Sequence, residues 1–115
     1  MIDFACKEFN INEIIKCGLG LTKTELIIME SFIKNADKEF TTFLLSKKLN
    51  LNLTTIQKAV KKFYERNIIL RHQKNLSNGG YVYTYECNSK KEIRETIKKI
   101  IENWSVKVKQ EIDRW

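Results

Sequence analysis

The fold of this chain is decided by the stretch Asn52-Leu-Thr-Thr-Ile-Gln-Lys-Ala-Val-Lys-Lys-Phe-Tyr64. Read as a helix, the stretch carries four apolar residues on one stripe at the i, i+3, i+4, i+7 spacing: Ile56, Ala59, Val60 and Phe63. The opposite face carries Thr54, Gln57, Lys58 and Lys61, with Lys62 at its edge. The apolar stripe predicts that this side of the helix is buried. The free face presents hydroxyl, amide and ammonium groups, which suit the base edges and phosphates of a DNA major groove.

A second amphipathic segment precedes this helix, Phe43-Leu-Leu-Ser-Lys-Lys-Leu49, and only residues 50–52 separate the two. Helix, three-residue turn and helix is the spacing of a helix-turn-helix, whose second helix enters the major groove of double-stranded DNA. We expect the free face to read bases, with Gln57 suited to adenine. Phosphate contacts are expected from four basic side chains: Lys47, Lys48, Lys62 and Arg71.

The net charge of +7 is unevenly distributed along the 115 residues. Residues 1–40 have a net charge of −2, residues 41–75 of +7 and residues 76–115 of +2. The positive excess therefore lies in the segment that contains the helix-turn-helix, which is the pattern expected of a nucleic-acid contact.

Two further helices are predicted before this motif. The first runs over residues 10–17 and is stopped by Gly18-Leu-Gly20. Thr22-Lys-Thr-Glu25 then has the form of a capping box that starts the second helix, which ends near residues 35–37. Thr41 or Thr42 is expected to cap the helix that follows, and Asn52 the next one. The second helix is expected to bury Leu26, Ile28, Met29, Phe32 and Ile33.

After Asn67 the periodicity changes from helix to strand. Residues 68–74 and 81–87 read as two strands, and Ser77-Asn-Gly-Gly80 reads as a tight turn. Asn-Gly between two such runs favours a hairpin, because both central turn residues can take positive φ. Alternation of Tyr81, Tyr83 and Tyr85 on one face indicates core or interface packing rather than base stacking. A hairpin placed after a helix-turn-helix is a wing.

A last helix is predicted from about residue 90 to residue 115, capped by Ser89. At ~1.5 Å per residue it extends about 39 Å, which is more than one small domain covers. Its apolar stripe is therefore expected to pack partly on its own chain and partly on a second copy, giving a two-fold homodimer. The expected interface comprises Ile97, Ile101, Trp104, Val108, Ile112 and Trp115.

The order of elements resembles that of the winged helix-turn-helix regulators of the MarR and TrmB-like groups, particularly small archaeal members. The resemblance covers roughly residues 20–115 and is most specific over Leu44-Leu-Ser-Lys-Lys-Leu-Asn-Leu-Asn-Leu-Thr-Thr-Ile-Gln-Lys-Ala-Val-Lys-Lys-Phe-Tyr-Glu-Arg-Asn-Ile-Ile69. It implies wing contacts from Arg71, Lys74 and Asn78, although the wing tip, residues 75–80, holds no Arg or Lys. The implied organisation is a DNA-binding domain over residues 1–88 and a dimerisation helix over residues 89–115. The expected fold class is mostly α with a small β-hairpin.

Other classes of function are less well supported by the sequence. His72 has no second histidine, and no paired carboxylates or Gly-rich phosphate loop accompany it, so no enzyme, metal or cofactor is expected. No apolar run reaches the ~20 residues of a membrane span. The N-terminus does not resemble a secretory signal, and Cys6, Cys17 and Cys87 read as reduced thiols, so a cytoplasmic protein is expected.

Three alternatives stay open: a winged-helix adaptor that binds protein without touching DNA, a redox- or ligand-controlled switch on the same scaffold, and RNA binding. For the redox alternative, Cys6 and Cys17 are the candidate sensor thiols.

Overall fold

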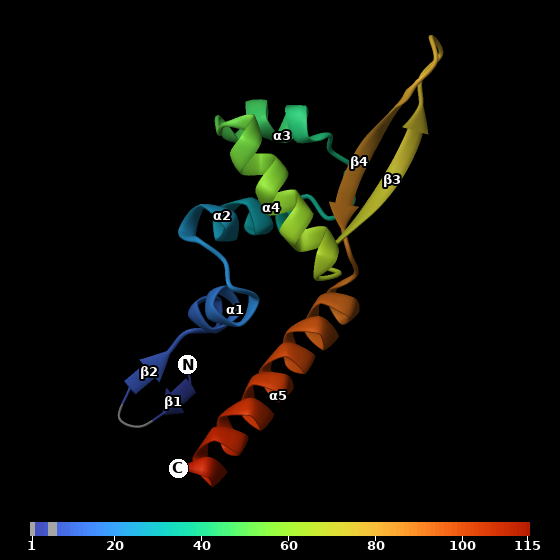
Figure 1. The fold of residues 1–115 in the computed structure, drawn as a ribbon. Coiled ribbons are helices and arrows are strands. Elements are labelled where there is room, and N and C mark those ends of the chain that lie inside the picture. The colour runs from blue at the N-terminus through green and yellow to red at the C-terminus, as the bar shows by residue number, and fades with distance from the viewer. Residues whose placement is uncertain (1, 5–6) are drawn as a thin grey trace.

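The computed structural model describes residues 2–4 and 7–115, with side chains from Glu8 onward. The molecule is elongated, 61 × 25 × 25 Å, with a body of helices and a β-hairpin at one end and a long helix that runs away from it (Figure 1). The elements, in chain order, are β1 (Ile2–Phe4), β2 (Lys7–Phe9), α1 (Ile11–Leu19), α2 (Lys23–Lys34), α3 (Thr42–Leu49), α4 (Leu53–Glu65), β3 (Ile69–Asn75), β4 (Tyr81–Cys87) and α5 (Lys90–Arg114). The expected fold class, mostly α with a small β-hairpin, is confirmed.

The helix starts are fixed by the capping residues that the sequence indicates. In the capping box of α2 the backbone N–H of Glu25 donates to the Thr22 hydroxyl at 3.1 Å, and the backbone N–H of Thr22 donates to the Glu25 carboxylate at 2.8 Å. Thr41, rather than Thr42, caps α3. Asn52 caps α4 and Ser89 caps α5, as predicted.

The core lies where α2, α3 and α4 meet the base of the hairpin. All four stripe residues of α4 are buried, which confirms the predicted back of that helix. Phe63 meets Phe32 of α2 edge to face, with ring centroids 6.3 Å apart, and Phe32 meets Phe40 in the same way at 6.2 Å. The prediction for α2 was wrong at Ile33, which is 37% exposed.

Strands β3 and β4 pair antiparallel from Ile69 opposite Cys87 to Asn75 opposite Tyr81, forming the predicted wing. Phe40, in the loop before α3, forms an isolated β-bridge to β4, since its backbone exchanges two 2.8 Å hydrogen bonds with Tyr85. The turn differs from the prediction. The connecting loop spans residues 76–80, and positive φ falls on Gly79 and Gly80 (89° and 78°) rather than on the Asn-Gly pair.

The N-terminal region also differs from the prediction. Strands β1 and β2 form a small antiparallel hairpin before α1, where no strand was expected. Gly18 lies within α1, and the helix ends only at Gly20, whose φ of 65° is the left-handed conformation that glycine adopts without strain. Cys6, one of the two candidate sensor thiols, lies outside the described residues.

Helix α5 leaves the body along α1, and the two helices contact each other (Figure 1). Ile93 is buried, while Ile97 and Ile100 are half-buried against the core. From Ile101 to the end of the helix the apolar residues are exposed within this chain.

Candidate nucleic-acid interface

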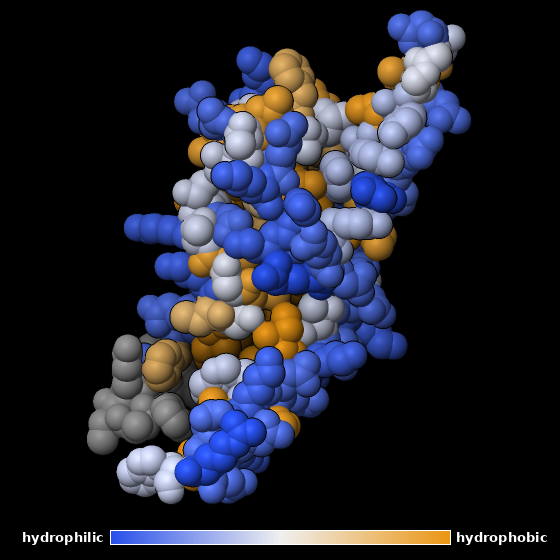
Figure 2. All heavy atoms as spheres, in the orientation of Figure 1, coloured by the Kyte–Doolittle hydropathy of each residue, from blue (hydrophilic) through white to orange (hydrophobic). Residues whose placement is uncertain are grey.

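The outward face of α4 is open to solvent. Thr54, Gln57, Lys58 and Lys61 are all exposed, whereas the four stripe residues behind them are at most 2% exposed. In Figure 2 hydrophilic residues cover this side of α4. The helix therefore presents its polar side chains on a rigid, anchored support.

The turn between α3 and α4 is held by hydrogen bonds. Asn50 ends α3 in the left-handed conformation (φ 52°), which asparagine tolerates better than most residues. The Ser46 hydroxyl donates to the Leu51 carbonyl at 2.8 Å, and the backbone N–H of Leu51 donates to the Ser46 carbonyl at 3.1 Å. These bonds fix the direction in which α4 leaves the turn.

Two lysines on α3 are exposed beside this turn. The ammonium group of Lys47 lies 5.3 Å from the centroid of the Phe43 ring, and that of Lys48 lies 4.8 Å from the centroid of the Phe40 ring. Both lysines remain accessible to an external anion.

Lys62 has a different environment from the one the sequence predicted. Its ammonium group donates to the Glu25 carboxylate at 2.7 Å and to the Gly20 carbonyl at 3.0 Å. Its side chain is 25% exposed and that of Glu25 only 9%. Burial alone would raise the pKa of Glu25, but the hydrogen bonds from Lys62 and Thr22 and the charge of Lys62 hold that pKa below its ordinary value of 4.5. In this structure the Lys62 ammonium group therefore joins α4 to Glu25 of α2 and to the Gly20 carbonyl.

The wing residues fall on different sides of the hairpin. Arg71 faces α4, whereas Lys74 makes a 3.6 Å ion pair with Glu39, which also accepts a 2.7 Å hydrogen bond from the Thr84 hydroxyl. Asn78 lies in the exposed loop at the tip. Of the three predicted wing residues, only Arg71 shares a groove with α4.

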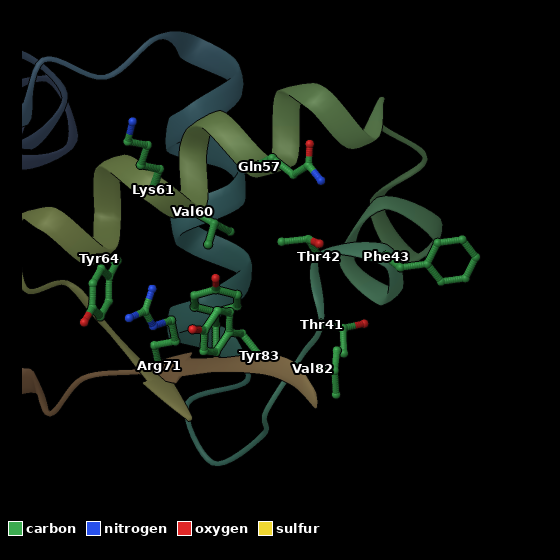
Figure 3. A pocket seen from close by; sticks show the side chains of 11 residues that line it. Thr41, Thr42, Phe43, Gln57, Val60, Lys61, Tyr64, Arg71, Val82 and Tyr83 are labelled. Carbon is green, nitrogen blue, oxygen red and sulfur yellow. The ribbon is translucent and has the colours of Figure 1, made fainter. Parts of the chain in front are cut away.

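That groove lies between α4 and the wing and has a volume of about 410 Å³ (Figure 3). The Arg71 guanidinium lies 4.4 Å from the centroid of the Tyr64 ring and 4.3 Å from that of Tyr83, so an aromatic ring from each element flanks it. The groove is lined by Thr41, Thr42, Phe43, Gln57, Val60, Lys61, Tyr64, Arg71, Val82, Tyr83 and Tyr85.

The tyrosines of β4 have separate surroundings. Tyr85 packs against the core, Tyr83 contacts Arg71, and Tyr81 is 55% exposed with its ring centroid 5.2 Å from that of Tyr83. Tyr64 was not among the predicted site residues. Its position on α4 three residues after Lys61 was the available signal, because residues three apart are neighbours on a helix.

The predicted dimer residues on α5 are mostly exposed in a single chain. Ile97 is half-buried, whereas Ile101, Trp104, Val108, Ile112 and Trp115 are between 36% and 104% exposed. A shallow groove of about 630 Å³ is lined by Trp104, Lys107, Val108, Glu111, Ile112 and Trp115.

The histidine and cysteine side chains of the described residues have separate surroundings. No cluster of three His, Cys, Asp or Glu side chains suited to a metal ion occurs among those residues. His72 contacts the Glu86 carboxylate at 2.7 Å. Burial, followed by the charge of Glu86, raises the pKa of the Cys87 thiol, while Cys17 is exposed. Within the same described residues no helix is long and apolar enough to cross a membrane.

Comparison with known proteins identifies the family of this chain. The model of the DnaD N-terminal domain matches residues 9–112. The chain belongs to the DnaD N-terminal domain family. The motifs of the sequence did not indicate this family by name, but the winged helix-turn-helix regulator fold that they resembled is confirmed.

The chain is similar to several known proteins. A solved structure from Methanosarcina mazei Go1, described as a possible transcriptional regulator, is 48% identical with a TM-score of 0.88, and the match covers 100% of this chain and 96% of that one. An uncharacterised protein of Methanocaldococcus jannaschii is 24% identical over 94% of this chain and 80% of its own length. A mutant of MepR from S. aureus, 8% identical, shares the fold alone with a TM-score of 0.55, over 90% of this chain and 72% of that one.

Proposed function

We propose that this protein is a sequence-specific transcriptional regulator that binds double-stranded DNA as a homodimer. The observation that carries the proposal is the exposed Thr54, Gln57, Lys58 and Lys61 face on a helix whose other side is fully buried. The +7 charge of residues 41–75 supports it, as does the 48% identical relative described as a possible transcriptional regulator.

In this proposal α4 enters the major groove. Gln57 and Lys58 reach base edges, with Thr54 and Lys61 at the two ends of the reading face. Lys47, Lys48 and Arg71 contact backbone phosphates, which supply most of the affinity. Lys74 and Asn78 lie farther out on the wing and contact a neighbouring stretch of the DNA backbone.

Residues 1–88 form the DNA-binding unit in this proposal, and residues 89–115 join two copies in the cytoplasm. A two-fold dimer places its two recognition helices about one turn of DNA apart, so the expected operator is a pseudo-palindrome. Selection of bound sites from random duplexes tests both points, because a consensus without two-fold symmetry argues against the dimer.

We expect binding to weaken steeply with salt. If four to six phosphates are neutralised per dimer, log K falls with log salt at a slope of about −4 to −5, because bound lysines and arginines release condensed counterions. Fluorescence anisotropy of a labelled duplex over a series of salt concentrations measures the slope. Affinity that does not change with salt would remove this mechanism.

Lys61→Ala is expected to weaken duplex binding about tenfold without changing the melting temperature, since the side chain is exposed and loses only a contact to DNA. The control is Lys23→Ala, which removes the same charge from α2, outside α3, α4 and the wing. If both variants bind like the wild type, the groove-facing side of α4 has been misassigned.

A second candidate function is a winged-helix adaptor that docks on a protein partner without DNA contact. The observation that favours it is the exposure of two large apolar side chains at the start of α3, Phe43 (58%) and Leu44 (53%). This alternative predicts no measurable affinity for any duplex in the same anisotropy titration.

A further inference from the structure

The arginine between the wing and α4 has an unusual environment for an exposed side chain. Tyr64 lies against one side of the Arg71 guanidinium at 4.4 Å and Tyr83 against another at 4.3 Å. Tyr83 is in turn supported by Tyr81, whose ring centroid is 5.2 Å away. A long, flexible side chain is thereby held in one place before any ligand arrives.

No carboxylate among the described residues pairs with Arg71. Within the described part of the chain Arg71 also makes no hydrogen bond to a backbone carbonyl. Aromatic rings attract a guanidinium through its faces and leave the N–H donors at its edge free. The N–H donors at the edge of the guanidinium group are the ones that bind a phosphate in a bidentate manner.

The surroundings of Arg71 suit an anion of the size of a phosphodiester. The groove of about 410 Å³ also holds the side chains of Lys61, Thr41 and Thr42 (Figure 3). Lys61 lines the α4 side of the groove with its ammonium group turned away from Arg71, and the threonine hydroxyls can donate hydrogen bonds. The lining thus combines these hydroxyl groups with apolar side chains such as Val60 and Val82.

We propose that the groove between α4 and the wing binds one phosphodiester of the duplex per protomer, and that Tyr64 and Tyr83 are positioning residues that hold the Arg71 guanidinium for it. This rests on the proposed function, since the phosphate belongs to the DNA that α4 reads. The two tyrosines reduce the conformational freedom that Arg71 loses on binding. They contribute to affinity without touching a base.

The test is a set of variants titrated with a labelled random-sequence duplex over a salt series. Arg71→Gln is expected to make the slope of log K against log salt shallower by about two per dimer, because one phosphate contact per protomer is lost. Arg71→Lys keeps the charge and therefore the slope, but its affinity is expected to fall about tenfold, because an ammonium group lacks the planar fork.

The tyrosines are tested by a matched pair of double variants. Tyr64→Phe with Tyr83→Phe keeps both rings, and binding is expected to stay within about twofold of the wild type. Tyr64→Leu with Tyr83→Leu removes them, and affinity is expected to fall about tenfold with an unchanged salt slope. In the double leucine variant, Arg71→Lys is expected to lower the DNA affinity little further, since the tyrosine rings no longer hold the Arg71 guanidinium in position.

A purely structural role for the tyrosines would lower the melting temperature of the leucine variant and leave the DNA affinity of its folded fraction unchanged, which would overturn the inference. An unchanged slope for Arg71→Gln in a protein that otherwise binds duplex DNA would also overturn it. Absence of any duplex binding by the wild type is a separate result, which would refute the proposed function itself.

Discussion

A Trp104→Glu, Ile112→Glu variant is expected to be monomeric and to bind a symmetric operator at least about a hundredfold more weakly than the wild type. Both side chains lie on the exposed half of the α5 stripe, where Trp104 is 63% and Ile112 60% exposed in the single chain. Two carboxylates on each copy would face each other across the proposed two-fold interface. Because neither side chain belongs to the core, the monomer is expected to stay folded.

The loss of affinity follows from linkage between the two half-sites. A dimer that has engaged one half-site holds its second α4 close to the other, so the second contact forms at a high effective concentration. A monomer has no such advantage. Sedimentation equilibrium gives the assembly state, and anisotropy with one-half-site and two-half-site duplexes gives the affinities.

The matched control places the same two changes of charge on another face of the same helix. Asn103→Glu with Gln110→Glu adds two carboxylates at exposed positions of α5 that lie off the apolar stripe. This variant is expected to remain dimeric and to bind with close to the wild-type affinity. Equal assembly states for the two double variants would show that the α5 stripe does not join the copies.

The predictable parts of the fold are those in which residues close together in the sequence determine the local structure. The α4 stripe follows from helical spacing, and the starts of α2, α4 and α5 follow from Thr22, Asn52 and Ser89. These local signals also position the outward face of α4. The exposure of that face was therefore predictable from the sequence.

The features that were missed depend on contacts between distant segments. The sequence placed Lys62 beside Lys61 at the edge of one polar face, but its partner Glu25 is 37 residues away in the chain. In the same way, the groove around Arg71 requires α4 and the wing to meet, which helical spacing alone does not specify. The β-bridge between Phe40 and Tyr85 joins residues that are 45 positions apart in the chain.

Lys62→Met is expected to destabilise the fold by about 2–3 kcal/mol, because it leaves the Glu25 carboxylate poorly solvated and without its cation. For a domain of this size the melting temperature should fall by about 10 °C. The affinity of the folded protein for DNA should hardly change, because the Lys62 ammonium group is already occupied by Glu25 and the Gly20 carbonyl. Thermal melting and anisotropy below the melting range measure the two effects.

The pH dependence of this loss identifies its cause. The folded-state pKa of Glu25 is depressed, so its contribution to stability is present above its ordinary pKa of 4.5 and is lost as the pH falls through the folded value. The gap in melting temperature between wild type and Lys62→Met should therefore be largest near neutral pH and should narrow below pH 4.5. A gap that stays constant into acid would point to lost packing of the lysine stem instead.

Lys61→Met is the matched control, since it makes the same chemical change one residue earlier on α4. Because the apolar stripe of α4 is buried, Lys61 lies on the outer side of the helix and Lys62 lies beside α2. The two substitutions should therefore have different effects. Lys61→Met is expected to lose DNA affinity and keep its melting temperature, while Lys62→Met does the reverse. Lys61 would then contribute to DNA binding and the adjacent Lys62 to the stability of the fold. If the two variants have the same phenotype, the two lysines do not have these separate roles.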